Sequence, residues 1–180
     1  EYDTSTEVKE IVTVDGRARI VKTSKGDYRA DAVLVNADYA WAEENLLRPA
    51  DRSYSTKYWK SRVYAPSMFL VYLGVSRRMK KLTHHNLYFS ENWNEHFKTI
   101  FEKPSWPENP CFYISCTSVT DPTVAPAGTE NVFLLVPIAP GLDDNDEQRE
   151  KYCAMLLDHV EKVTGEKIKP YITLKRIFSV

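Results

Sequence analysis

The longest apolar run of this 180-residue chain, Met68–Val75, sets the limits of the fold because it is only eight residues long. A helix that crosses a bilayer needs about 20 apolar residues, so the sequence predicts no transmembrane helix. Both faces of the run are apolar, which is typical of a central strand in a sheet. The chain has 24 basic and 25 acidic residues, a formal charge of −1, and therefore no electrostatic reason to bind nucleic acid.

Alternating and helical patterns predict the elements around this central strand. Other strands are expected within residues 7–35, where three are predicted, and at 84–90, 111–117, 131–138 and 168–178. Helices are expected to begin after three capping residues, Asp38, Asn92 and Asn145. Connections that are both short and helical favour an α+β fold, with a mixed or largely antiparallel sheet and helices on one face.

The first 48 residues form a region of their own. Asp15-Gly16 is a strong hairpin signal and predicts an N-terminal β-ribbon. Ala32–Val35 is a continuous apolar run, which predicts a strand buried on both faces. Residues 49–66 are polar and aromatic and predict a linker or an irregular crossing. We therefore expect two domains, residues 1–48 and residues 49–180.

Histidine and aromatic side chains on the predicted sheet are the candidate substrate-binding residues. A strand over 84–90 would put His84 and His85 on opposite faces, so the two cannot bind one ion together, and no metal site is predicted. Asp121 before Pro122 is either a base or pocket residue, or a turn starter. The tyrosines suit a large, flat, apolar ligand or ordinary core packing. The candidates are Tyr72, His84, His85, Tyr88, Tyr113 and Asp121, with no catalytic residue assigned.

The six glycines exclude the usual phosphate-binding turns. They are too far apart for G-x-G-x-x-G or a Walker loop, so no cofactor-binding residue is predicted within the chain. The three cysteines have no metal-like spacing and are expected to be buried thiols in a reducing compartment. No signal peptide is visible, so we expect a cytoplasmic protein, either free or peripheral to a membrane.

An ordered set of short motifs resembles the phytoene desaturases, the FAD-dependent carotenoid desaturases of bacteria and fungi. Each motif alone is weak, but six in the family's order are specific. They are YRADAVLVNAD (28–38), FLVYLG (69–74), LTHHNLYF (82–89), Ile100-Phe101, TDPTVAPAG (120–128) and FLLVP (133–137). The chain departs from the family in two ways: Ala127 stands where an acidic residue is usual, and both glycine-rich FAD-binding ends are absent.

The resemblance implies that the chain is the middle of a longer flavoenzyme. Residues 1–48 would be the tail of a Rossmann-like FAD domain, with the β-ribbon, a returning strand and a helix, and residues 49–180 most of the substrate-binding domain. The implied reaction desaturates phytoene or a related carotenoid by hydride transfer to FAD. The chain alone is expected to be inactive. Its substrate, a long apolar polyene, implies peripheral membrane contact, with the basic cluster Arg77–Lys81 as the candidate surface.

Other functions stay open at this point. A carotenoid isomerase or a retinoid saturase of the same superfamily would look similar in this region. A non-catalytic isoprenoid- or lipid-binding module belongs to a different class. An amine oxidase relative would need an aromatic cage and an acid near the flavin for its polar substrate, and no clear one is visible. No motif specifies the carotenoid, the number of desaturation steps, the electron acceptor or the oligomeric state.

Overall fold

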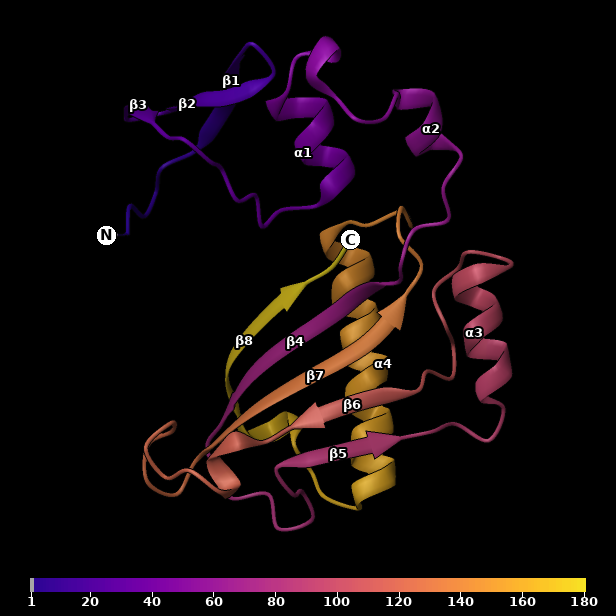
Figure 1. The fold of residues 1–180 in the computed structure, drawn as a ribbon. Helices are drawn as coiled ribbons and strands as arrows, with labels where there is room; N and C mark the ends of the chain where they lie inside the picture. Colours follow the sequence, from indigo (N-terminus) through magenta and orange to yellow (C-terminus); the bar gives the residue numbers. More distant parts are fainter. Residues whose placement is uncertain (1) are drawn as a thin grey trace. The chain divides into compact units, whose positions relative to one another are not determined.

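The computed structural model describes residues 2–180, which divide into two compact units after Val63. The first unit contains an antiparallel sheet in the order β1-β2-β3, followed by short helices (Figure 1). Asp15 and Gly16 form the predicted hairpin turn, and both have a positive φ, as a type I′ turn requires. The elements are β1 (Val8–Val14), β2 (Arg17–Thr23), β3 (Gly26–Arg29), α1 (Tyr39–Leu46), the 3-10 helix η1 (Pro49–Asp51) and α2 (Thr56–Lys60).

A small core holds the first unit together. Ile11 of β1 packs with Ala42 and Leu46 of α1. The Asp38 carboxylate accepts a hydrogen bond from the backbone N–H of Trp41 at 2.8 Å and caps α1, as the sequence predicts. The ribbon and the helix thus pack through one small apolar patch.

The strand predicted over Ala32–Val35 is wrong. The segment is not part of any sheet, Leu34 is 96% exposed, and Val33 packs only partly against the small core. A strand buried on both faces needs paired neighbours and a covering layer on each side. Residues 2–63 place neither against this segment, so its apolar run stays unpaired and largely exposed.

Glu43 of α1 fixes the segment that follows the helix to the first unit. Its buried carboxylate accepts hydrogen bonds from the backbone N–H groups of Ser53 (2.7 Å) and Tyr54 (3.2 Å) and from the indole N–H of Trp59 (3.2 Å). Burial opposes ionisation of Glu43, but these hydrogen bonds outweigh it and lower its pKa. The first compact unit therefore extends beyond the division expected after residue 48.

The second unit is a five-stranded sheet with the long helix α4 across one face (Figure 1). The strand order is β5-β6-β7-β4-β8, and every neighbouring pair is antiparallel. The apolar run forms β4 between β7 and β8, which confirms both the central strand and the α+β class. The elements are β4 (Ser67–Val75), β5 (His85–Tyr88), α3 (Trp93–Phe101), β6 (Phe112–Ser115), η2 (Thr117–Val119), β7 (Glu130–Ile138), α4 (Asp146–Thr164), η3 (Lys169–Tyr171) and β8 (Ile172–Phe178).

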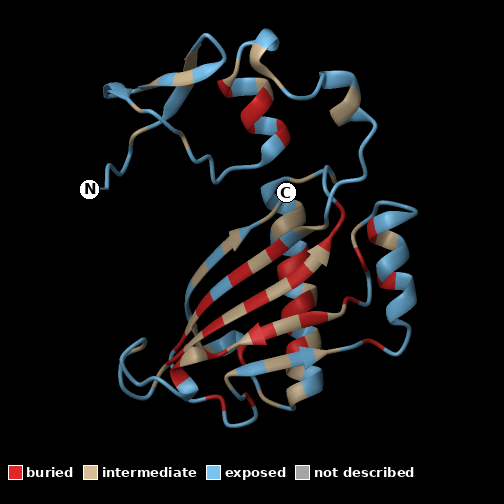
Figure 2. Ribbon diagram, viewed as in Figure 1, coloured by how far each residue is buried: buried red, intermediate tan, exposed pale blue. Residues whose placement is uncertain are grey.

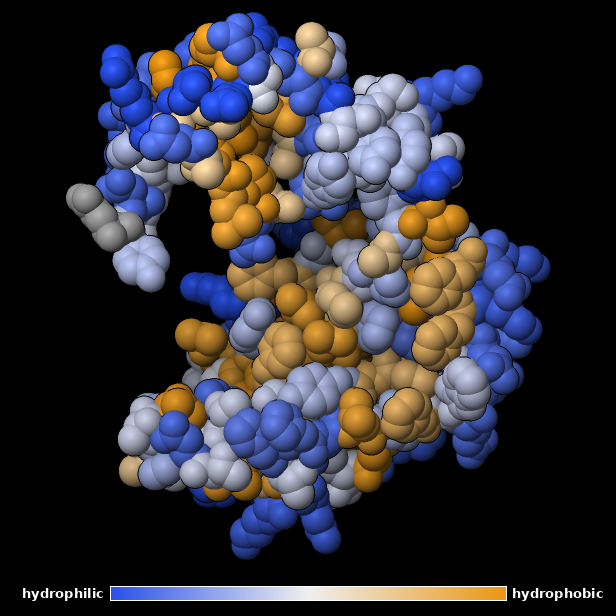
Figure 3. Space-filling model, in the orientation of Figure 1, coloured by the Kyte–Doolittle hydropathy of each residue, from blue (hydrophilic) through white to orange (hydrophobic). Residues whose placement is uncertain are grey.

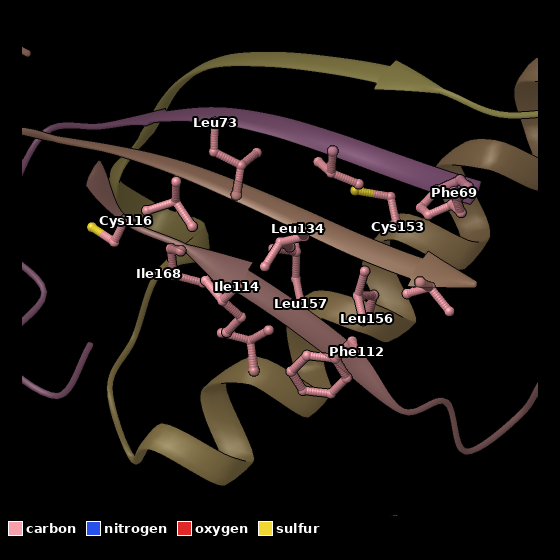
Figure 4. Packing of buried hydrophobic residues seen from close by; sticks show 14 of the residues in the cluster. Phe69, Leu73, Phe112, Ile114, Cys116, Leu134, Cys153, Leu156, Leu157 and Ile168 are labelled. Atoms are coloured by element: carbon pink, nitrogen blue, oxygen red, sulfur yellow. The ribbon is translucent and has the colours of Figure 1, made fainter. Parts of the chain in front are cut away.

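The main core lies between α4 and the sheet. Every second side chain of β4 and β7 faces the helix and is almost fully buried (Figures 2 and 4). The core includes Phe69, Val71, Leu73, Val75, Phe112, Ile114, Val132, Leu134, Val136, Ile138, Tyr152, Cys153, Leu156, Leu157 and Val160. Asn145 caps the start of α4 through the N–H of Gln148, and Gly165 ends the helix with a φ of 67°, both as predicted.

Three details of the second unit complete the comparison with the sequence. The capping box expected at Asn92 does not form, because the Asn92 side chain makes no capping bond and Glu95 pairs instead with Lys98 at 2.7 Å. Cys116 and Cys153 are buried, and desolvation raises the pKa of each thiol to about 11. Among the helices within residues 2–180, none combines the length and the apolar character needed to cross a bilayer.

Candidate functional site

The face of the sheet opposite α4 is not covered by any helix of the second unit. Alternation sends every second side chain of β4, β7 and β8 to this open face. Four of these side chains are large, apolar and exposed: Met68 by 40%, Tyr72 by 42%, Leu174 by 52% and Phe178 by 58%. Figure 3 shows hydrophobic residues gathered over this side of the sheet. A contiguous exposed apolar surface of this kind marks a binding surface.

Six aromatic side chains form a row across the open face, from edge strand β5 to edge strand β8. Neighbouring ring centroids lie 4.1 to 6.3 Å apart in the order His84, His85, Tyr113, Phe133, Tyr72 and Phe178. We call this set the aromatic row. Tyr72 and Phe133 lie directly opposite each other on β4 and β7, with centroids 4.9 Å apart. Five strands spaced by about 4.8 Å give the row a length of about 19 Å.

A groove of about 620 Å³ lies over part of the aromatic row. Its floor includes Tyr72, Phe133 and Leu174, and its wall includes residues 124–126 of the TDPTVAPAG motif. Polar groups also line it, from Ser115, Thr117 and Asn131. The groove therefore combines an aromatic floor, an apolar wall and a few polar atoms, which is the usual make-up of a small-molecule site.

The two neighbouring histidines stack on each other, which corrects the expectation that they point to opposite faces. Strand β5 begins at His85, so strand alternation does not govern His84. The rings lie 4.1 Å apart at 28°. His84 Nδ1 is 2.7 Å from Thr120 Oγ1, and His85 Nδ1 is 2.6 Å from Tyr113 Oη. Across residues 2–180, no group of three or more His, Cys, Asp or Glu side chains is arranged to hold a metal ion.

Tyr88 and Asp121 lie outside the aromatic row. Tyr88 packs against the main core and stacks on Phe112 with centroids 4.7 Å apart. The Asp121 carboxylate accepts hydrogen bonds from the hydroxyl and the backbone N–H of Thr123, which lower its pKa. This is the geometry of a turn-forming aspartate. The structure thus brings four of the six candidates together, and their contact with a substrate stays a prediction.

Phe133 and Phe178 are the row members that the sequence reasoning missed. A period of two over residues 131–138 puts Phe133 on the face opposite Leu134, so this one could have been found. Phe178 could not, because its place beside Tyr72 depends on the pairing of β8 with β4, which are far apart in sequence.

His96 is a third residue that the sequence did not single out. It is buried on α3, where its Nδ1 accepts a hydrogen bond from the Cys111 backbone N–H (2.9 Å) and its Nε2 donates one to the Pro137 carbonyl (2.7 Å). Both ring nitrogens are thus used in the neutral form. Desolvation lowers the pKa of His96, against a smaller opposing effect of the bond to Pro137. His96 attaches α3 to β7 and has a structural role.

The basic cluster Arg77–Lys81 is partly used by the fold. The Arg77 guanidinium pairs with Glu166 at 3.6 Å and lies over the ring of Tyr171. The Arg78 guanidinium pairs with buried Glu130 at 3.1 Å. The two arginines therefore hold neighbouring loops, which leaves the ammonium groups of Lys80 and Lys81 as the part of the cluster available to a partner.

The glycines do not build a cradle for the FAD pyrophosphate. Such a cradle needs a glycine-rich turn between a strand and the start of a helix. Here Gly16 lies in a hairpin turn, Gly26 begins β3, Gly74 lies inside β4 and Gly165 ends α4. Gly141 lies between β7 and α4, but no second glycine stands near it. The described residues therefore do not fit this part of FAD, and no chemical step through a flavin is derived from them.

Known proteins resemble this chain both in fold and in sequence. The fold matches an oxidoreductase from Methanosarcina mazei with a TM-score of 0.60 at 15% identity, over 97% of this chain and 37% of that one. The chain therefore has the fold of part of an oxidoreductase. No protein-family model matches it.

The sequence relatives define the family more closely. A carotenoid 3,4-desaturase from Haloarcula japonica is 43% identical over 180 residues, which are 99% of this chain and 36% of the relative. A zeta-carotene-forming phytoene desaturase from Myxococcus xanthus is 36% identical over 84% of this chain and 30% of the relative. Over nearly its whole length the chain is homologous to the carotenoid desaturases, which confirms the resemblance drawn from the six motifs. It spans about a third of the length of these relatives.

Proposed function

We propose that the chain binds a long conjugated polyene along the aromatic row, as part of an enzyme that desaturates carotenoids. A polyene hydrocarbon has no hydrogen-bonding group. Its affinity must come from buried apolar area, at about 25 cal/mol per Å², and from contacts with ring faces. The aromatic row is the observation that carries this proposal, because it offers a line of rings to a linear, flat molecule.

We propose further that the full-length protein removes two hydrogens per step from the polyene, one of them as a hydride to FAD. This part rests on the motif resemblance and on the names of the homologues. FAD would supply the electron-accepting chemistry. The part assigned to this chain is to bind the polyene, fix its orientation on the sheet and exclude water from it.

Saturable binding of a polyene by the purified chain tests the first proposal. A linear polyene hydrocarbon is titrated into the chain in detergent, and quenching of the protein's fluorescence is followed. Phe133→Ala removes the central ring of the row, and we expect about tenfold weaker binding from lost area and lost ring contacts. Val163→Ala, a change of an exposed α4 residue in the other layer, should leave affinity unchanged. No saturable binding, or equal affinity in both variants, would contradict the proposal.

The redox part of the proposal has its own tests. The chain alone is expected to bind FAD weakly, and tight stoichiometric flavin in the purified chain would contradict this. For the full-length protein, the products distinguish the alternatives: two hydrogens lost indicate a desaturase, an unchanged mass indicates an isomerase, and two hydrogens gained indicate a saturase. An unchanged substrate under all conditions would favour a binding module.

Membrane contact stays a separate proposal. Because Arg77 and Arg78 are bound to Glu166 and Glu130, we assign any contact with anionic lipid to Lys80 and Lys81. Each such charge contributes about 1 kcal/mol near an anionic surface. The double variant Lys80→Glu/Lys81→Glu should therefore sediment less with anionic liposomes than the unchanged chain, and equal sedimentation would rule this surface out.

A further inference from the structure

The TDPTVAPAG loop, residues 120–128, forms a wall of the groove but is barely held by burial. Every residue of this loop except Ala125 is exposed, and residues 124–126 line the groove. The loop connects η2 to β7 at one end of the sheet (Figure 1). Since burial contributes little, the position of this wall depends on the two stems of the loop, residues 117–119 and 129–131.

Arg78 reaches the loop from the connection that follows β4, and it binds both stems. Its Nη1 donates to the carbonyl of Ser118 before the loop (3.4 Å) and to the carbonyl of Thr129 after it (3.3 Å). The same guanidinium pairs through Nε with the Glu130 carboxylate at 3.1 Å. Acceptors on both sides of one planar group hold it in a single orientation. We call these contacts of Arg78 with Ser118, Thr129 and Glu130 the arginine clasp.

Buried polar groups fix the inner side of the arginine clasp. Glu130 is 2% exposed, and its carboxylate also accepts hydrogen bonds from the Ser118 hydroxyl and from the Met79 backbone N–H (3.4 Å). Asn131 joins the stems a second time, because its side-chain oxygen accepts a hydrogen bond from the Ser118 backbone N–H at 3.0 Å. A buried carboxylate that loses its partners is costly, so Glu130 is held firmly. The Arg78 side chain is about half exposed and can therefore be changed without opening the core.

We propose that Arg78 is a positioning residue of the groove, which holds the TDPTVAPAG loop against the bound polyene by clasping both stems. This inference rests on the proposed function. Within residues 2–180, Arg78 is not one of the side chains that line the groove, so it acts through wall residues such as Val124. A wall that is fixed in advance loses little conformational entropy when the ligand binds. A loosened wall must be ordered at that moment, which weakens binding.

Arg78→Lys tests the inference, because lysine keeps a positive charge beside Glu130 but lacks the planar fork that also reaches both stem carbonyls. In titrations with a linear polyene hydrocarbon, this variant of the 180-residue chain should bind roughly fivefold more weakly than the unchanged chain. Arg77→Lys is the matched control, since the neighbouring Arg77 pairs with Glu166, and it should leave the affinity unchanged. Thermal unfolding followed by circular dichroism checks that both variants are folded.

A double-mutant cycle separates positioning of the wall from a general weakening of the fold. Val124→Ala trims the wall and should weaken binding roughly fourfold in the unchanged chain. In the Arg78→Lys background, where the wall is already loose, the same change should cost less than about twofold. Phe133→Ala, on the floor of the groove, should weaken binding by the same factor in both backgrounds. A merely structural role of Arg78 would not couple it to Val124 alone.

Three results would overturn the inference while leaving the proposed function intact. They are equal affinity of Arg78→Lys and the unchanged chain, an equal loss in Arg77→Lys, and a cost of Val124→Ala that is the same in both backgrounds. If the unchanged chain shows no saturable binding of the polyene, the proposed function fails first and the inference fails with it.

Discussion

The two faces of the five-stranded sheet come from the same strands but differ in chemistry. Toward α4, the side chains are mainly aliphatic and closed off from water, with Val71 and Leu134 fully buried. On the open face, the same strands present aromatic rings, such as Tyr72 at 42% exposure beside Phe178 at 58%. In β4 the change occurs between adjacent residues, Val71 and Tyr72.

This difference separates stability from binding. Branched aliphatic side chains fill the space under α4 at high density, which is what a core needs. Aromatic rings left in contact with water contribute little to the stability of the isolated fold, yet they offer large, rigid contact areas to a partner. We therefore expect substitutions toward α4 to act on the free energy of unfolding, and those on the open face to act on ligand affinity.

The largest expected effect comes from a pair of adjacent leucines in β7. Leu134 is fully buried toward α4, whereas Leu135 lies on the open face. Leu134→Ala should lower the free energy of unfolding by about 2–5 kcal/mol, through lost transfer energy and a cavity. Leu135→Ala should cost about 1 kcal/mol or less. Urea unfolding followed by circular dichroism measures both, and equal losses would mean that the two faces are packed alike.

Much of this sheet could be predicted from the sequence, because local patterns determine it. The run Met68–Val75 gave β4, and the turn at Asp15-Gly16 and the caps at Asp38 and Asn145 gave element boundaries. The failure at Ala32–Val35 has a physical cause. An apolar run shows that burial would be favourable, but burial also requires partner strands, and a local pattern contains no information about them.

The site was less predictable for a related reason. Tyr72, His85 and Tyr113 could be proposed from their strands, but a row is a property of the register between strands. Phe178 joins Tyr72 only because β8 pairs with β4, and His84 stacks on His85 only because β5 starts one residue later than expected. Neither fact follows from periodicity alone.

A smaller effect is expected at His96, which attaches α3 to β7. Its pKa is lowered from the usual 6.5, so the folded state holds it neutral. The unfolded chain then binds more protons below about pH 6.5, and the stability due to His96 is present above this pH and lost as the pH falls. His96→Gln should remove two hydrogen bonds, at about 1–3 kcal/mol, and reduce the pH dependence.

The control for this prediction is His159→Gln on α4, where the one hydrogen bond of the imidazole within residues 2–180 is to the Met155 carbonyl of its own helix. That variant should keep the loss of stability between pH 7 and pH 5. Unfolding curves in urea at several pH values provide the comparison. If His96→Gln keeps the same slope as the unchanged chain, another group is responsible for it.

Glu161 of α4 should make the free energy of unfolding depend on pH in the acid range. Burial opposes its ionisation, but backbone N–H groups of Lys169 and Ile168 and the ammonium of Lys167 outweigh it and lower the pKa to about 2. The stability that the Glu161 carboxylate contributes is therefore present in full above pH 4.5, the usual pKa of a glutamate. It is lost as the pH falls toward 2. Glu161→Gln should cost about 1–2 kcal/mol at pH 7 and flatten the acid limb. An unchanged acid limb would contradict the assignment.

The smallest expected effect on stability is at Gly74, on the open face of β4. A Cβ there would lie 3.3 Å from Leu174 Cβ and 3.5 Å from Thr173 Oγ1 of β8. Gly74→Ala removes the entropic cost of a strand glycine, about 0.5–1 kcal/mol, and the crowding against β8 offsets it. The net change in unfolding free energy should stay below about 1 kcal/mol.

The same methyl group would enter the groove that Gly74 helps to line, so polyene affinity should fall more than stability does. Fluorescence titration and urea unfolding of the one variant give both numbers. A large loss of stability with unchanged affinity would contradict the distinction between the two faces. It would mean that β8 cannot move to accommodate the methyl group, so that the open face is packed as tightly as the covered one. A loss of affinity alone would confirm that this face of the sheet serves binding.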